Sequence, residues 1–132
     1  MKNKLPVAIN LTSDFLPGYT FQFEDVRFTE YVELYYSVSP PLPMPDQNNI
    51  DTEYVWIDGE MKDNLDNNYT YGGGAHGPSD LGLITTGSLS FSPLPSGEVT
   101  QIFFLIDALR GKQPYRVNFS VNLCCKNTPD LS

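Results

Sequence analysis

Acidic side chains crowd into the segment between residues 58 and 68. Asp58, Glu60, Asp63 and Asp66 carry carboxylates there, and three asparagines lie among them or just after them. Hard cations such as Ca²⁺ take oxygen ligands of this kind from a loop. The segment lacks the D-x-D-x-D-G spacing of a calcium-binding loop. Two interpretations therefore stay open: a calcium site on these four carboxylates, or a solvated acidic hairpin loop that keeps a sheet edge from pairing.

Aromatic side chains flank the acidic segment on both sides. Tyr54 and Trp56 precede it, and Tyr69 and Tyr71 follow it. Tyr and Trp bury a large area at a small cost in entropy, so they are favoured where a carbohydrate or a peptide binds. The same residue types also form ordinary cross-strand pairs within a sheet. These four positions are the candidate ligand or partner surface, and packing within the fold is the alternative.

The residues that could act as nucleophile or base lack the neighbours that catalysis requires. His76 is the only histidine, in a glycine-rich segment at residues 72–78 that we expect to be a flexible loop. No serine stands in a G-x-S-x-G motif, and Cys124 and Cys125 are adjacent instead of having C-x-x-C spacing. We expect His76 to be exposed, and one cysteine to be buried and the other exposed. No catalytic residue is assigned.

The chain is acidic, with 16 acidic and 8 basic residues among 132 and a formal net charge of −8. Nucleic acids and anionic membranes attract clustered Lys and Arg, so we expect neither as a partner. No apolar stretch approaches the length of a membrane-spanning helix, and none follows the N-terminal lysines as a signal peptide requires. If Met1 is the native start, the sequence favours a cytoplasmic protein.

Short segments of alternating apolar and polar residues run through the chain. This period of two predicts β-strands, and the prolines and glycines between them predict turns. The charged pair at residues 24–25 indicates a bulge, Asp58–Gly59 a turn, and residues 108–110 one helical turn within a polar connection. The strands are expected at residues 5–12, 19–28, 31–39, 54–57, 69–71, 83–91, 99–106 and 115–123.

The strand expected at residues 99–106 is apolar on both faces. Phe104 and Ile106 point to one side, and Phe103 and Leu105 point to the other. Such a strand is central in its sheet and is covered on both sides or lies against a partner. Together with residues 31–38, it makes self-association one expected mode of interaction.

Residues 86–107 carry a pattern that resembles bacterial immunoglobulin-like β-sandwich domains. It reads G-x-L-x-F-x-P-x-P over residues 87–95 and V-T-Q-I-x-F from Val99, with an upstream D-x-x-Y at residues 51–54. The resemblance implies an accessory or interaction module, often outside the cytoplasm, with no catalytic residues to carry over. The Cys…Trp…Cys core of antibody domains is absent, so the likeness is to the sandwich and not to that subgroup.

These observations predict one all-β domain over residues 1–132, an antiparallel immunoglobulin-like β-sandwich of seven to eight strands. The expected function is a non-enzymatic binding or interaction module that needs no cofactor and binds a protein partner or a second copy. Two alternatives remain. One is a carbohydrate- or calcium-binding sandwich, and the other is a small enzyme with a carboxylate site carried on loops.

Overall fold

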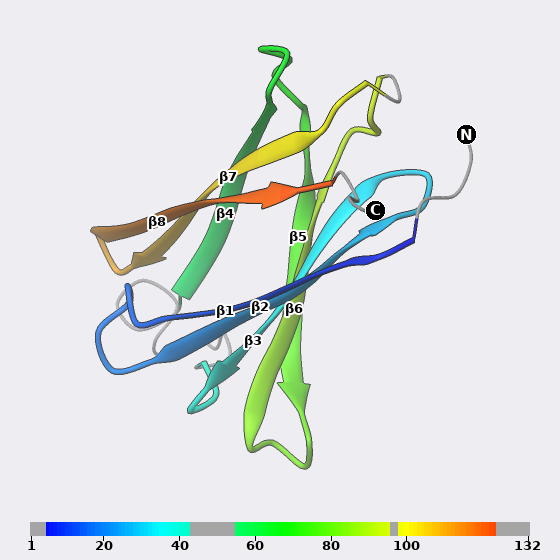
Figure 1. The fold of residues 1–132 in the computed structure, drawn as a ribbon. Coiled ribbons are helices and arrows are strands. Elements are labelled where there is room, and N and C mark those ends of the chain that lie inside the picture. Colours follow the sequence, from blue (N-terminus) through cyan, green and yellow to red (C-terminus); the bar gives the residue numbers. More distant parts are fainter. Residues whose placement is uncertain (1–4, 43–54, 96–97, 124–132) are drawn as a thin grey trace.

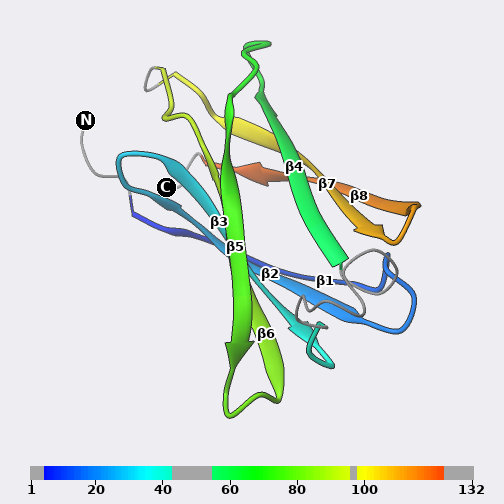
Figure 2. The same ribbon diagram turned by 180° about the vertical axis from the view of Figure 1, so that it is seen from behind.

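The computed structural model describes residues 5–42, 55–95 and 98–123, which form eight antiparallel strands in two sheets. The five-stranded sheet has the order β1-β2-β3-β6-β5, and the three-stranded sheet has the order β4-β7-β8. Figure 1 shows the two sheets as separate layers, and Figure 2 shows them from behind. The predicted all-β fold of seven to eight strands is therefore confirmed. The strands are β1 (Val7–Ser13), β2 (Thr20–Phe28), β3 (Val32–Ser39), β4 (Val55–Asp63), β5 (Tyr71–Ser79), β6 (Ile84–Phe91), β7 (Gln101–Arg110) and β8 (Gln113–Asn122).

The core lies between the two sheets and is rich in aromatic rings. Alternation along the strands turns Leu34 of one sheet and Phe104 of the other inward, and both are almost fully buried. Phe119 joins them: its ring centroid lies 5.5 Å from that of Phe104 and 4.7 Å from that of Phe23. Tilted pairs at such distances add to the free energy gained by burial alone. The apolar faces thus meet in one shared interior, as the alternation predicts.

The predicted turn at Asp58–Gly59 is wrong, because β4 continues through both residues to Asp63. Gly59 pairs with Ile106 on β7 and faces the core. A Cβ at Gly59 would lie 3.2 Å from the side chains of Ile106, Leu89 and Phe91. The glycine therefore makes room for the opposite sheet, and pairing with β7 overrides its preference for a turn.

The glycine-rich segment at residues 72–78 is also not a loop, since it belongs to the edge strand β5 and pairs with β6. A Cβ at Gly74 would lie 2.5 Å from Leu89 Cδ2 and 2.8 Å from the Ser88 carbonyl oxygen. The strand needs glycine there to approach its neighbour. His76 consequently lies half-buried within a strand, and burial lowers its pKa below the ordinary value.

The predicted polar connection at residues 107–114 is replaced by a tight hairpin. β7 extends to Arg110, β8 begins at Gln113, and Gly111 adopts a φ of +61° in the turn. No helical turn forms at residues 108–110. The predicted bulge at residues 24–25 is confirmed by a register shift between Phe23 and Asp25.

Candidate interaction surface

The outer face of the five-stranded sheet is polar. Across β2, β3 and β6 its outward positions are mostly Ser, Thr, Gln and charged residues. Arg27, Tyr35 and Glu33 interact with one another on this face. The Arg27 guanidinium lies 4.0 Å from the centroid of the Tyr35 ring, and the Tyr35 hydroxyl donates to Glu33 at 3.1 Å. This face follows the ordinary rule of an antiparallel sheet, apolar inside and polar outside.

The outer face of the three-stranded sheet departs from that rule. Trp56 is 52% exposed, Phe103 42% and Leu109 38%, although all three are large and apolar. They lie on β4 and β7 and point away from the core, because their neighbours in the chain point into it. We call this surface the three-stranded face. Its rows, from β4 through β7 to β8, are Trp56–Leu109–Pro114, Asp58–Asp107–Arg116, Glu60–Leu105–Asn118 and Lys62–Phe103–Ser120.

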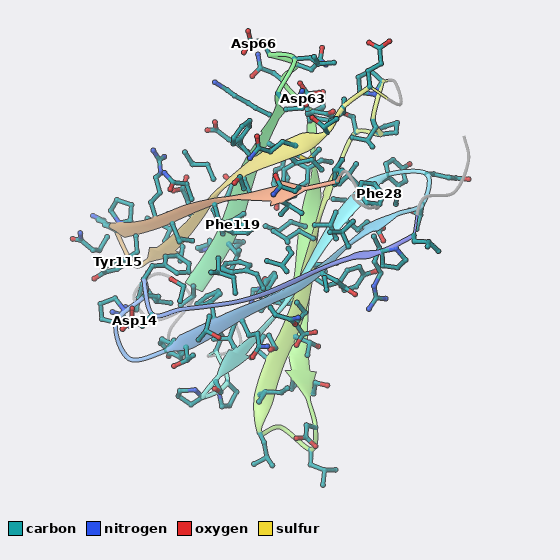
Figure 3. The ribbon with its side chains drawn as sticks, viewed as in Figure 1. Asp14, Phe28, Asp63, Asp66, Tyr115 and Phe119 are labelled. Atoms are coloured by element: carbon teal, nitrogen blue, oxygen red, sulfur yellow. The ribbon has the colours of Figure 1, made fainter. Side chains whose placement is uncertain are left out.

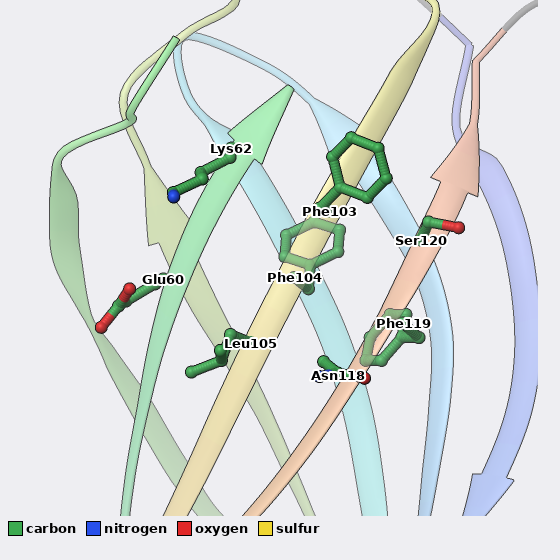
Figure 4. Close-up of a pocket in the computed structure, with 8 residues that line it drawn as sticks. All are labelled: Glu60, Lys62, Phe103, Phe104, Leu105, Asn118, Phe119 and Ser120. Carbon is green, nitrogen blue, oxygen red and sulfur yellow. The ribbon is translucent and has the colours of Figure 1, made fainter. Parts of the chain in front are cut away.

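One end of the three-stranded face holds a depression of about 420 Å³. Figure 4 shows side chains that line it, among them Glu60 and Lys62 on β4 and Phe103 on β7. Its lining also includes Leu105, and Asn118 and Ser120 of β8 lie across from these side chains. An apolar centre between polar edges is the usual anatomy of a protein interface.

The other end of the face holds a second depression of about 390 Å³, lined by both apolar and charged side chains. Arg116 donates two hydrogen bonds to the Asp107 carboxylate, at 2.7 and 3.2 Å, and this pairing raises the pKa of Arg116 above its ordinary value. Asp58 of β4 lies directly opposite Asp107, on the side of Asp107 away from Arg116. Trp56, Leu109 and Pro114 complete the lining.

The structure does not bring the four acidic residues of the predicted calcium site together. Asp58 and Glu60 point outward from β4, whereas Asp63 points inward. Asp66 lies in the connection after β4, with a φ of +67° (Figure 3). Over residues 5–42, 55–95 and 98–123, no group of three or more His, Cys, Asp or Glu side chains is placed to hold a metal ion.

Asp63 organises the connection between β4 and β5 instead. Its carboxylate accepts hydrogen bonds from the backbone N–H groups of Leu65 and Asn67 at 2.8 and 3.0 Å. It also accepts from the Asn67 amide at 2.8 Å and the Tyr69 hydroxyl at 2.7 Å. Burial alone would raise the pKa of Asp63, but these donors outweigh it and lower the pKa below the ordinary value. Burial and the same carboxylate raise the pKa of Tyr69.

The candidate aromatic residues do not form one platform. Trp56 lies on the three-stranded face, while the Tyr69 hydroxyl is bound to Asp63. The Tyr71 ring packs against Phe91, with centroids 5.5 Å apart. Tyr54 lies outside the described residues, as do Cys124 and Cys125. Among the described candidates, only Trp56 is thus placed on an outer face.

Leu109 and Pro114 are surface residues that the sequence reasoning missed. Both lie within residues 107–114, which were expected to form a polar connection and not part of a strand. The signal was present in the chain, because the outward series Phe103, Leu105 and Asp107 continues in steps of two to Leu109. Extending the strand by this period would have placed Leu109 beside Trp56.

No protein-family model and no curated protein matches the sequence. Among solved structures, the chain is similar to a conserved domain protein from Bacillus anthracis, with 16% sequence identity and a TM-score of 0.60. The similarity covers 94% of this chain and 50% of that one, so the chain spans about half the length of its structural neighbour. Within the described residues, no helix has the length and apolar character needed to cross a membrane. The likeness supports the all-β sandwich fold.

Proposed function

We propose that this domain is a non-catalytic interaction module that binds a protein partner through the three-stranded face. The observation that supports this proposal is the contrast between the outer faces of the two sheets. One is polar, whereas the other exposes Trp56 of β4 and Phe103 and Leu109 of the central strand β7. Large apolar side chains gathered on one face, here on either side of the charged row Asp58–Asp107–Arg116, suit an interaction site.

The strand order supports an immunoglobulin-like form of the sandwich. Without β1, the sheets read β2-β3-β6-β5 and β4-β7-β8. These orders correspond to A-B-E-D and C-F-G of the constant-type immunoglobulin domain, with β1 as an added edge strand. On this assignment, the proposed binding face belongs to the C-F-G sheet.

The placement of the reactive residues favours binding over catalysis. His76 is in β5 of the five-stranded sheet, whereas Asp58 and Glu60 are on β4 of the three-stranded sheet and point outward. The Asp63 carboxylate faces inward and receives four hydrogen bonds that hold its own connection. These groups therefore do not converge on a common reaction centre.

Photo-crosslinking in the cells from which the sequence derives tests the proposal. A benzophenone amino acid replaces Phe103 in one variant and Ser88, on the outer face of the five-stranded sheet, in another. We expect a discrete protein adduct from position 103 and none from position 88. Adducts of equal yield from both positions would show that the surface is not selective. Adducts from position 88 alone, or from neither, would contradict the proposal.

A further inference from the structure

We infer, on the basis of the proposed interaction module, that the depression beside Trp56 takes a cationic side chain, Lys or Arg, from a segment of the partner protein. The first argument is the charge on the three-stranded face. It carries three carboxylates, Asp58, Glu60 and Asp107, but only two cations, Lys62 and Arg116. One negative charge is left over on this surface.

The register locates the surplus charge at Asp58. Asp58 and Asp107 lie directly opposite each other on β4 and β7, an arrangement that is unfavourable for two like charges. Arg116 compensates Asp107, but it lies on β8, on the far side of Asp107 from Asp58. Among the described residues, the hydrogen bond that Asp58 accepts comes from the Gly59 N–H, at 2.7 Å. A second cation beside Asp58 would complete the row.

The neighbours of Asp58 suit a long cationic side chain. Trp56 precedes it by two residues on the same face of β4, which places the two side chains about 7 Å apart along the strand. A Lys or Arg that reaches the carboxylate can therefore pass over the indole, the most favourable aromatic partner for a cation. Leu109 and Pro114 offer apolar contacts for the aliphatic stem.

A second copy of the chain fits this surface less well than a basic segment does. The net charge of −8 repels another copy and attracts a cationic partner. Four rows across three strands give a surface on the order of 400 Å², from the ordinary strand and residue spacings. A stable protein interface needs about 800 Å² on each side. The area therefore suits one extended segment.

The test uses a seven-residue peptide of alternating leucine and lysine, blocked at both ends, and a matched peptide with glutamine in place of lysine. Binding is followed by two-dimensional ¹H–¹⁵N NMR, because Trp56 is the only tryptophan and gives a single indole N–H signal. We expect the lysine peptide to shift the indole and the amides of β4 and β7. Asp58→Asn should weaken binding about fivefold. The control Asp80→Asn removes one charge from the turn between β5 and β6 and should change affinity less than twofold.

The outcomes separate this inference from the proposed function. If the glutamine peptide binds equally well at Trp56, the face binds apolar segments, so the cationic preference is wrong and the interaction module stands. Equal losses in Asp58→Asn and Asp80→Asn would mean diffuse attraction to an acidic protein, which overturns the inference. No shift at the indole also overturns it, whereas the crosslinking at Phe103 judges the proposed function independently. Indole shifts that follow protein concentration without peptide would identify a second copy as the occupant and reject a basic segment.

Discussion

The substitution Asp63→Asn tests whether the Asp63 carboxylate stabilises the fold by holding the connection between β4 and β5. The carboxylate accepts four hydrogen bonds, two at each oxygen. Asparagine keeps one oxygen and places an NH₂ group where the other oxygen accepted from Asn67 and Tyr69. A hydrogen bond to a charged group contributes about 1.5–3 kcal/mol.

The Tyr69 hydroxyl can rotate and recover part of the lost hydrogen bonding. We therefore expect the variant to lose only about 3 kcal/mol of unfolding free energy. For a domain of this size, that corresponds to a fall in Tm of about 10 °C. Thermal unfolding followed by circular dichroism at pH 7 measures it. The matched control is Asp66→Asn in the same connection, where the backbone has a φ of +67° that asparagine tolerates. The control variant should have the same Tm as the wild type.

The pH dependence gives an independent check with a defined sign. The pKa of Asp63 is lowered in the folded chain, so folding favours its ionised form. Its contribution is therefore complete above the unfolded-state pKa of about 4 and is lost as the pH falls through the folded-state value. The Tm difference between wild type and Asp63→Asn should be constant from pH 6 to 8 and narrow below pH 4. A variant that melts within 2 °C of wild type at pH 7 would refute the assigned role.

Three further predictions follow from the packing. Gly74→Ala should lower the unfolding free energy measured in urea by about 1–3 kcal/mol, because its Cβ would meet Leu89 and the backbone. The control Gly77→Ala, on the same strand, places its Cβ in open space and should change the unfolding free energy little. Equal losses in the two variants would count against the packing argument. Arg110→Lys should cost about 1 kcal/mol in the same assay, since the guanidinium donates to the Pro17 carbonyl at 3.0 Å and lies 5.5 Å from the Tyr115 ring centroid; an unchanged midpoint would contradict this. Millimolar calcium should leave Tm unchanged relative to EDTA, because the structure does not bring the four candidate carboxylates together. A rise of several degrees would restore the calcium site.

The alternation of apolar and polar residues was sufficient to predict most of the strands. Residues 32–38 show why: each inward residue is buried and each outward one is less so, as expected where one face meets a core. The same periodicity correctly placed Leu34 and Phe104 in one interior. Apolar residues recur at every second position along a strand, so one exception to the alternation does not change the predicted strand.

Local turn signals failed where tertiary packing needs a missing side chain. Asp58–Gly59 and the glycines of residues 72–78 have the composition of turns and loops, yet they lie in β4 and β5. Gly59 and Gly74 are there because side chains of the core and of the neighbouring strand occupy the space of a Cβ. Only the partner strands reveal that requirement, so a single sequence favours the turn.

The candidate site was predicted in part. Trp56 was named as a candidate surface aromatic, and Phe103 and Leu105 as the second apolar side of a central strand. The structure places all three on the three-stranded face, with Trp56 at one end and Phe103 at the other. Asp63 was grouped with Asp58 by proximity in the sequence, although an odd separation along one strand turns the two side chains to opposite faces. Cross-strand register, which sets Asp58 opposite Asp107, cannot be read from one strand alone.

Quenching of Trp56 fluorescence tests the central claim most directly, that the three-stranded face is open and negatively biased beside this residue. The emission reports this position alone, because the chain has a single tryptophan. Relative to its quenching of free N-acetyltryptophanamide, caesium should quench Trp56 more efficiently than iodide does at low ionic strength, and Asp58→Asn should reduce this preference more than Asp80→Asn does. Emission that resists both ions would mean that the indole is covered. Identical behaviour of the two variants would mean that the bias comes from the whole protein and not from this face.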